Sequence, residues 1–300
     1  MGEDTTMGLF IGFDVGGTHI KHGVIDDEGN ELECDEFDTP DNAESFKEQW
    51  QKVVESWQKS HDIQAIGVSF PGHINTHTGQ AARAGALSYL DEVNLYELFG
   101  GLTDLPVIAE NDANCAALGE RWRGAGRHYE SFVCMTIGTG IGGGIVTEGD
   151  LYRGAHYRAG EFGVIPVGNK GECMYEVASA RGLMEACRKA LALSEDDMPD
   201  GEALFTRMDS DVHLREAINE WALYLSRGVY SVISMFDPQA VLIGGGISEQ
   251  EKIYTLMEKH LETFEEWDAL RVPIMPCELG NQAGRLGAVW LARQKWASRA

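Results

Sequence analysis

Apolar and small residues near the start of the chain give way to glycines in a pattern that predicts strand, tight turn, strand. Ile11 to Val15 is mostly apolar, Gly16-Gly17-Thr18 follows, and an extended pattern resumes through Gly23-Val24-Ile25. Glycines at such a turn allow positive φ and let backbone N–H groups approach an anion. Asp14 is placed to hold Mg²⁺ through water. An ordinary hairpin with an exposed Asp explains the same residues.

The remaining apolar periodicity alternates between helical and extended. It predicts helices over 42–59 (with Asn42 as its cap), 115–122, 212–236, 250–264 and 286–296, strands over 63–70, 107–109, 132–137 and 240–243, and a loop over 73–92. Strands that alternate with helices favour a layered α/β fold.

A second glycine turn repeats the first one. Residues 13–18 match 135–140, and 23–26 match 144–147, at a spacing of about 120 residues that suggests two copies of one domain. The two turns would then face each other across a cleft, although a similarity this short also arises by chance. A third glycine run, Gly244-Gly245-Gly246, follows a strand and precedes a helix, as at sites where a phosphate or nucleoside meets a helix N-terminus.

Composition narrows the function. The 300 residues suggest about two domains, and no run approaches the roughly 18 apolar residues that a membrane span needs. A net charge of −24 argues against nucleic acid and anionic membranes as partners. The polar, acidic start is unlike a signal peptide, and six scattered cysteines without a CxxC pair suggest reduced thiols, so we expect a cytoplasmic protein.

Six motifs in order resemble the ROK (repressor, open reading frame, kinase) family of sugar kinases and repressors, over about residues 9–296. They are Asp14-x-Gly16-Gly17-Thr18-x-x-Lys21, Pro71-Gly72, Glu110-Asn111-Asp112-Ala113-Asn114, Gly138-Thr139-Gly140-x-Gly142-Gly143, Gly160-Glu161-Phe162-Gly163 and Gly244-Gly245-Gly246. The resemblance implies an actin-like, ribonuclease-H-like fold of two α/β domains with the active site in the interdomain cleft. We expect a small domain over 9–120, completed by the helix 284–297, and a large domain over 121–283.

The resemblance also implies an activity. It implies an ATP- and Mg²⁺-dependent kinase that phosphorylates a hexose hydroxyl, most often the 6-OH, as glucokinases, β-glucoside kinases and N-acetylhexosamine kinases do. Asp112 is the candidate general base, although an Asp that only caps the following helix would look the same. Only about eight residues precede the first expected strand, which leaves no room for a repressor's helix-turn-helix. A sugar-binding regulator without turnover is the alternative.

The remaining site residues are carried over from the matching motifs. Gly16, Gly17 and Thr18 are expected to line one phosphate loop, Gly138, Thr139 and Gly140 the other, and Gly245 and Gly246 the adenosine end. Lys21 either neutralises phosphate or is a surface lysine. The sugar contacts are expected from Asn111, Gly72, Glu161 and Glu176, with Tyr175 as the alternative to Glu176.

The chain departs from the zinc-binding pattern of many family kinases. Where those read Glu-x-Gly-His followed by a cysteine cluster, this chain has Glu161-Phe162-Gly163-Val164, and only Cys173 follows nearby. A structural zinc site needs four Cys or His ligands, so we predict no structural zinc. The loss of the His leaves the sugar and its anomeric preference open. We expect a homodimer, because dimers are common in the family.

Overall fold

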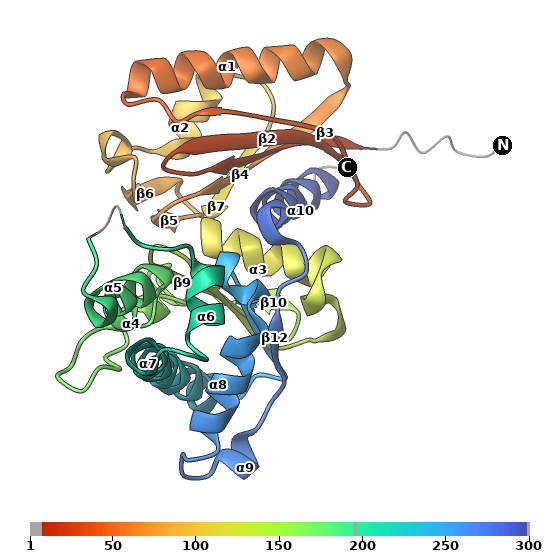
Figure 1. Ribbon diagram of the computed structural model, residues 1–300. Helices are drawn as coiled ribbons and strands as arrows, with labels where there is room; N and C mark the ends of the chain where they lie inside the picture. The colour runs from red at the N-terminus through yellow and green to blue at the C-terminus, as the bar shows by residue number, and fades with distance from the viewer. Residues whose placement is uncertain (1–7, 195–196, 299–300) are drawn as a thin grey trace. The chain divides into compact units, whose positions relative to one another are not determined.

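The computed structural model describes residues 8–194 and 197–298, which form two compact units. Unit 1 consists of the described residues within 1–128, 151–159 and 281–300, and unit 2 of those within 129–150 and 160–280. Figure 1 traces the chain through both units.

Unit 1 is a five-stranded sheet between two layers of helices. Its elements are β1 (Leu9–Val15), β2 (His19–Asp26), β3 (Glu31–Asp38), α1 (Ala43–Ser60), β4 (Ile63–Phe70), β5 (His73–Asn75), β6 (Gln80–Arg83), the 3₁₀ helix η1 (Ser88–Leu90), α2 (Leu95–Gly100), β7 (Val107–Asn111), α3 (Asp112–Arg123), η2 (Ala125–His128) and α10 (Ala283–Ala297). The sheet order is β3-β2-β1-β4-β7, with β1 antiparallel to β2 and parallel to β4.

Side chains of β1 alternate between the two faces of this sheet, and its apolar residues pack against a helical layer on each face. Phe13 stacks on Trp50 of α1 with ring centroids 5.3 Å apart, whereas Phe10 contacts Trp296 of α10 edge-on at 5.8 Å. Burial of large aromatic side chains is the main favourable term here. In Figure 1, α1 lies on one side of the strands of unit 1 and α10 on the other.

Glycines let α10 approach its neighbours at backbone distance. A Cβ on Gly287 of α10 would lie 1.8 Å from the carbonyl oxygen of Cys115 in α3. A Cβ on Gly67 of β4 would lie 2.2 Å from the carbonyl oxygen of Ala288. The C-terminal helix is therefore an integral part of unit 1.

Unit 2 contains a second five-stranded sheet and its helices. The elements are β8 (Phe132–Ile137), β9 (Ile141–Thr147), β10 (Asp150–Leu151), η3 (Phe162–Val164), α4 (Met174–Val177), α5 (Ala180–Leu191), α6 (Gly201–Arg207), α7 (Val212–Phe236), β11 (Val241–Gly244), η4 (Gly246–Glu249), α8 (Glu251–Leu261), α9 (Trp267–Leu270), β12 (Ile274–Pro276) and η5 (Gly280–Gln282), the last of which continues into unit 1. The sheet order is β10-β9-β8-β11-β12.

The two sheets repeat one topology. In each, an antiparallel hairpin is followed by parallel strands on its other side, and β1 and β2 correspond to β8 and β9. Both hairpins turn through three residues, Gly16 to Thr18 and Gly138 to Gly140. The internal repeat read from the sequence thus corresponds to a repeated strand order.

Most of the predicted elements are confirmed. The helix predicted over 212–236 is α7 with the same bounds, and Asn42 caps α1 by accepting a hydrogen bond from the backbone N–H of Ser45. The prediction of a loop over 73–92 is wrong, because β5 and β6 form a small hairpin there. Its strands are three and four residues long, too short for a period to be visible in the sequence.

His22 on β2 is a buried histidine held neutral. Its side chain is 5 % exposed, and its Nδ1 accepts a 3.0 Å hydrogen bond from Trp57 Nε1. Burial lowers the pKa of His22 from 6.5 to about 4; the nearby Asp35 opposes the shift and Arg285 adds to it. Protonation at Nδ1 would also remove the acceptor that Trp57 uses.

We expect this histidine to make unit 1 acid-sensitive. Since the folded-state pKa lies below the unfolded-state value, the stabilisation is complete above about pH 6.5 and is lost as the pH falls toward about 4. His22→Gln keeps an acceptor for Trp57 but does not titrate. Between about pH 7 and about pH 4.5 the wild type should lose on the order of 2 kcal/mol more unfolding free energy than the variant, measured by denaturant titration. Equal losses would contradict this assignment.

Within the described residues, none of the helices combines the length and the apolar character required to cross a lipid bilayer.

Candidate active site

The β1–β2 hairpin of unit 1 presents Asp14 next to two polar partners. Asp14 Oδ1 accepts a 2.7 Å hydrogen bond from Ser69 Oγ of β4. Lys21 of β2 lies opposite Asp14 in the antiparallel register, so the two residues share one face of the sheet. A Cβ on Gly284 of α10 would approach Asp14 Oδ1 to 2.7 Å, so the glycine leaves room for this carboxylate.

Neither glycine turn uses the positive φ that glycine allows. Gly16, Gly17, Gly138 and Gly140 all lie outside the glycines with positive φ. The reason for glycine differs between the turns. A Cβ on Gly16 would lie 2.8 Å from the carbonyl oxygen of His19, whereas a Cβ on Gly138 or Gly140 would meet no atom of the protein. The second turn therefore keeps space open beside its backbone.

Asp112 is the first residue of α3, and Asn111 is its N-cap. Asn111 Oδ1 accepts from the backbone N–H of Asn114 at 3.0 Å, which is the cap hydrogen bond. The sequence leaves open that Asp112 caps this helix, but the structure places the cap at Asn111. Asp112 is exposed, and its Oδ1 accepts from Asn111 Nδ2 and from the backbone N–H of Ala113.

Gly72 and Asn111 are brought together in unit 1. Asn111 Nδ2 donates to the carbonyl oxygen of Gly72 at 2.9 Å, so the Pro71-Gly72 loop and the Asn111–Asp112 turn are joined directly. Gly72 has φ +94°, and a Cβ there would lie 2.0 Å from the carbonyl oxygen of Arg83. Only glycine fits this position without a shift of the backbone.

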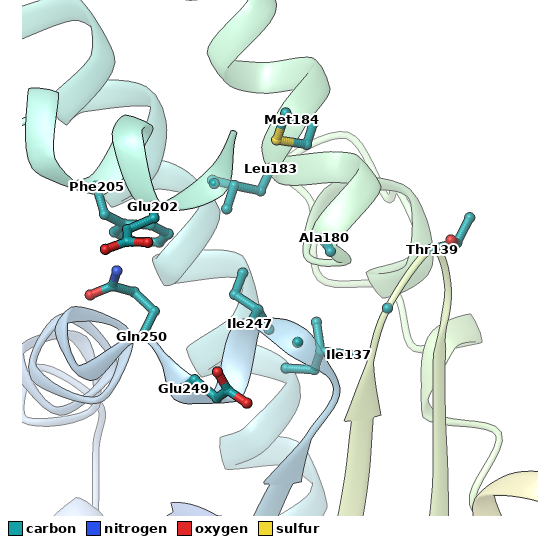
Figure 2. Close-up of a pocket in the computed structure, with 13 residues that line it drawn as sticks. Ile137, Thr139, Ala180, Leu183, Met184, Glu202, Phe205, Ile247, Glu249 and Gln250 are labelled. Carbon is teal, nitrogen blue, oxygen red and sulfur yellow. The ribbon is translucent and has the colours of Figure 1, made fainter. Parts of the chain in front are cut away.

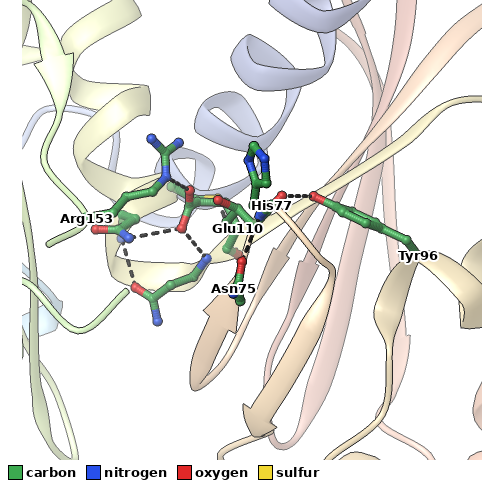
Figure 3. Close-up of polar contacts among 9 residues, drawn as sticks. Asn75, His77, Tyr96, Glu110 and Arg153 are labelled. Carbon is green, nitrogen blue, oxygen red and sulfur yellow. Dashed lines mark hydrogen bonds and ion pairs between the residues drawn. The ribbon is translucent and has the colours of Figure 1, made fainter. Parts of the chain in front are cut away.

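Cys115 of α3 is a buried thiol in the field of several carboxylates of unit 1. Burial raises the pKa of Cys115 well above its ordinary value, and the charges of Glu110, Asp14 and Asp112 raise it further. Cys115 therefore stays protonated and is no nucleophile. Among these carboxylates, Glu110 is bound by Arg153, a contact that no short-range sequence pattern indicates (Figure 3).

Unit 2 contains a pocket of about 630 Å³ beside its glycine turns. It is lined by Ile137, Gly138, Thr139, Ala180, Leu183, Met184, Gly201, Glu202, Phe205, Gly246, Ile247, Glu249 and Gln250. Figure 2 shows Thr139 at one end of this pocket and Glu202, Phe205 and Gln250 at the other. The volume lies within the range of about 300–1,000 Å³ typical of small-molecule sites.

Two chain segments position the glycines that line this pocket. The backbone N–H of Ala180, at the start of α5, donates to the carbonyl oxygen of Gly138 at 2.9 Å, which fixes a helix N-terminus beside that turn. Gly245 precedes η4 with φ +88°, and a Cβ there would lie 2.2 Å from the carbonyl oxygen of Ile137. Gly246, the next residue, has open space at its Cβ position. The arrangement suits an anion or a nucleoside at a helix start.

The two glutamates expected at the sugar differ in their surroundings. Glu161 is exposed and precedes η3, next to Gly160, which has φ +90°. Glu176 Oε2 accepts from the backbone N–H of Cys173 at 2.8 Å and so closes a capping box on α4. Tyr175 is 38 % exposed. The structure thus gives Glu176 a local structural role, and a sugar contact at this position stays a prediction.

Potential metal ligands are sparse. Within residues 8–194 and 197–298, no group of three or more His, Cys, Asp or Glu side chains is arranged to hold a metal ion. A single carboxylate at Asp14, hydrogen-bonded by Ser69, is compatible with Mg²⁺ bound mainly through water and nucleotide phosphates, because Mg²⁺ takes few protein ligands. The absence of structural zinc stays a prediction.

Comparison with known proteins identifies the family to which the chain belongs. The model of the ROK family matches residues 10–295. Two repeated α/β sheets and a likeness to a ROK glucokinase structure identify the actin-like, two-domain α/β fold that the sequence predicts. That structure, from Streptomyces griseus in complex with glucose and AMPPNP, is 30 % identical with a TM-score of 0.80, and the match covers 96 % of this chain and 100 % of that one.

The chain belongs to the ROK family. It is 35 % identical over 288 residues to a β-glucoside kinase of Listeria innocua, which covers 93 % of this chain and 95 % of that protein. It is also 32 % identical over 317 residues to a glucokinase of Streptomyces coelicolor, which covers 96 % of this chain and 98 % of the relative.

Proposed function

We propose that the chain is an ATP-dependent hexokinase-type phosphotransferase that moves the γ-phosphate of ATP to a hexose hydroxyl, most often the 6-OH. The observation that carries the proposal is the Asn111–Asp112 turn. It holds the exposed carboxylate of Asp112 at the start of α3, where Asn111 is the N-cap, in a chain whose relatives over nearly its whole length are named sugar kinases.

Asp112 is proposed as the general base. The sugar oxygen forms a bond to the γ-phosphorus, the bond from that phosphorus to the β,γ-bridging oxygen breaks, and ADP leaves. The hydroxyl proton passes to Asp112 late in the transfer, since an alcohol does not ionise onto a carboxylate beforehand. Mg²⁺ bound near Asp14 would neutralise phosphate charge. Lys21, opposite Asp14 in the hairpin, supplies positive charge on the same face.

The nucleotide is proposed to use the glycine turns. The adenosine end occupies the pocket of unit 2 beside Gly245 and Gly246, where Glu202, Glu249 and Gln250 offer acceptors for amino and hydroxyl groups. Phosphates are proposed to bind the backbone of Gly138-Thr139-Gly140 and of Gly16-Gly17-Thr18. The open space at the Cβ positions of Gly138, Gly140 and Gly246 supports this assignment.

The sugar is proposed to contact Asn111, Gly72, Glu161 and, in competition with its cap hydrogen bond, Glu176 or its neighbour Tyr175. Asn111 Nδ2 already donates to Gly72 and Asp112, so it would exchange one of these bonds for a sugar hydroxyl. A glucose, a β-glucoside and an N-acetylhexosamine all remain candidate substrates. The relatives named β-glucoside kinase and glucokinase favour the first two.

An ADP-release assay over a sugar panel tests the proposal. Glucose, aryl and alkyl β-glucosides, mannose and N-acetylmannosamine would each be offered with ATP and Mg²⁺. We expect at least one sugar to raise ADP release far above the sugar-free rate. Sugar binding by calorimetry with no ADP release from any sugar would favour the alternative, a sugar-binding regulator of the same fold.

Substitutions at two adjacent glycines are expected to separate nucleotide binding from folding. Gly246→Val adds a side chain in the pocket at a Cβ position with no protein atom within 4 Å, so the Michaelis constant for ATP should rise at least about tenfold while the melting temperature changes little. Gly245→Val should instead lower stability by roughly 2 kcal/mol or more, because φ is +88° and its Cβ would overlap Ile137. Unchanged ATP affinity in folded Gly246→Val would place the nucleotide elsewhere.

The domain boundaries, the homodimer and the cytoplasmic location remain predictions. Size-exclusion chromatography with light scattering would measure the oligomeric state.

A further inference from the structure

Glu110 is a buried carboxylate directly before the turn that carries Asp112. It lies in β7 and is 1 % exposed. Its Oε1 accepts from the backbone N–H of Asn111 at 2.9 Å and from Asn114 Nδ2 at 3.0 Å. One carboxylate oxygen therefore binds both the residue before Asp112 and a residue in the first turn of α3.

Arg153 binds the other oxygen of this carboxylate. Its Nε donates to Glu110 Oε2 at 2.7 Å, from the segment 151–159 of unit 1 that lies between two stretches of unit 2 in sequence. Figure 3 shows Arg153 reaching Glu110, with His77, Asn75 and Tyr96 nearby. Both residues line a cavity of about 820 Å³, where Arg153 is partly exposed and Glu110 is buried.

A buried charge is tolerated when it is paired and hydrogen-bonded. Of the three hydrogen-bond donors to the Glu110 carboxylate described above, Arg153 supplies the positive charge and the other two are neutral. Without Arg153 the carboxylate would have to rotate toward water, and this rotation would release the N–H of Asn111. Asn111 also donates hydrogen bonds to Gly72 and Asp112. A shift of Asn111 would therefore move the exposed carboxylate of Asp112 as well.

We propose that Arg153 is a positioning residue: by neutralising Glu110 it fixes the Asn111–Asp112 turn in the geometry needed for phosphoryl transfer. This inference rests on the proposed function. Arg153 touches neither the sugar nor the nucleotide in this account and acts only through Glu110. Its effect should therefore appear in kcat, not in the binding of ATP to unit 2.

The first test is the kinetics of Arg153→Gln. We expect kcat to fall about 10–100-fold with the Michaelis constant for ATP within about twofold of the wild type. Arg158→Gln removes the same charge from an exposed position in the same segment and should leave kcat unchanged. Rates are to be normalised to the folded fraction. A wild-type kcat in Arg153→Gln would overturn the proposal.

Two double variants separate positioning from general destabilisation. Glu110→Gln with Arg153→Gln removes both charges but keeps an acceptor for the N–H of Asn111, so kcat should recover toward the wild type relative to Arg153→Gln alone. In an Asp112→Asn background, adding Arg153→Gln should change the residual single-turnover rate less than about twofold. The proposal would be contradicted if Glu110→Gln with Arg153→Gln had a kcat as low as that of Arg153→Gln alone. It would also be contradicted if Arg153→Gln lowered the single-turnover rate by the same factor in the Asp112→Asn background as in the wild type.

Hydrogen exchange gives a readout that does not need turnover. The amides of 111–114 should exchange at least about tenfold faster in Arg153→Gln than in the wild type, with the amides of α7 unchanged, and Arg158→Gln should match the wild type. Should the wild type phosphorylate no sugar, the proposed function fails, while unchanged exchange at 111–114 in Arg153→Gln would refute the positioning role by itself.

Discussion

Asp112→Asn is expected to lower kcat by about 10²–10⁴-fold, the range typical of general-base catalysis. The substitution removes the proton acceptor but keeps an oxygen for both hydrogen bonds that Oδ1 accepts, from Asn111 Nδ2 and from the N–H of Ala113. The helix should persist because its N-cap is Asn111. Removing one negative charge from the first turn of an exposed helix lowers the free energy of unfolding by about 0.3–1 kcal/mol.

The measurement is single-turnover transfer from radiolabelled ATP to the best sugar of the panel. Asp104→Asn removes an exposed carboxylate of unit 1 that lies outside the proposed site, so it is the matched control and should retain wild-type kcat. Near-normal kcat in Asp112→Asn would remove this residue from the mechanism. Equal losses in both variants would point to net charge instead.

Gly287→Ala is expected to destabilise the protein by about 3 kcal/mol or more, although alanine is the better helix former. The added Cβ would lie 1.8 Å from the carbonyl oxygen of Cys115, a backbone atom of α3 that has no freedom to move aside. Because α10 also packs on β4 through Ala288, a shift of the helix would disturb the strand that carries Ser69.

Urea unfolding at neutral pH measures this effect, with Gly100→Ala as the control. Gly100 is the last residue of α2, and a Cβ there meets no atom within 4 Å, so this substitution should be neutral or slightly stabilising. A Gly287→Ala protein as stable as the wild type would mean that α10 does not pack against α3 at backbone distance.

Local sequence patterns predict those helices whose bounds depend on residues within the helix or directly beside it. The stripe from Leu214 to Ile233 predicts α7 to its last residue, since one face of a long helix must be apolar to be buried. Asn42 marks the start of α1 because its side chain satisfies a backbone N–H that the helix leaves unpaired. The paired glycine turns suggest two copies of one domain, and the two sheets repeat one strand order.

Contacts between distant residues were not predictable in this way. Arg153 and Glu110 are 43 positions apart, and nothing near Arg153 in the sequence indicates a buried carboxylate partner. The cap of α3 was assigned to Asp112 as an alternative, but Asn111 holds it, because a single residue of register decides which side chain reaches the N–H of Asn114. The positive φ that glycine allows is not used at Gly16, where a Cβ would instead crowd the carbonyl oxygen of His19.

In the candidate site, too, the motif residues are predictable from the sequence and their tertiary partners are not. The motif residues Asn111, Asp112 and Gly72 meet in unit 1, as their shared motif set implies, and Gly138, Thr139 and Gly246 line one pocket in unit 2. Ser69, Ala180 and Arg153, which bind Asp14, Gly138 and Glu110 respectively, come from tertiary packing and lie outside any short motif.

The chemical identity of the reaction product decides whether the protein is a sugar kinase with Asp112 as its base. After incubation of the enzyme with ATP, Mg²⁺ and the sugar that most stimulates ADP release, ³¹P NMR should show a phosphate monoester on a hexose carbon, formed in step with ADP and absent with Asp112→Asn. Release of inorganic phosphate in place of a sugar phosphate, or equal ester formation by Asp112→Asn, would contradict a sugar kinase that uses this carboxylate as its base.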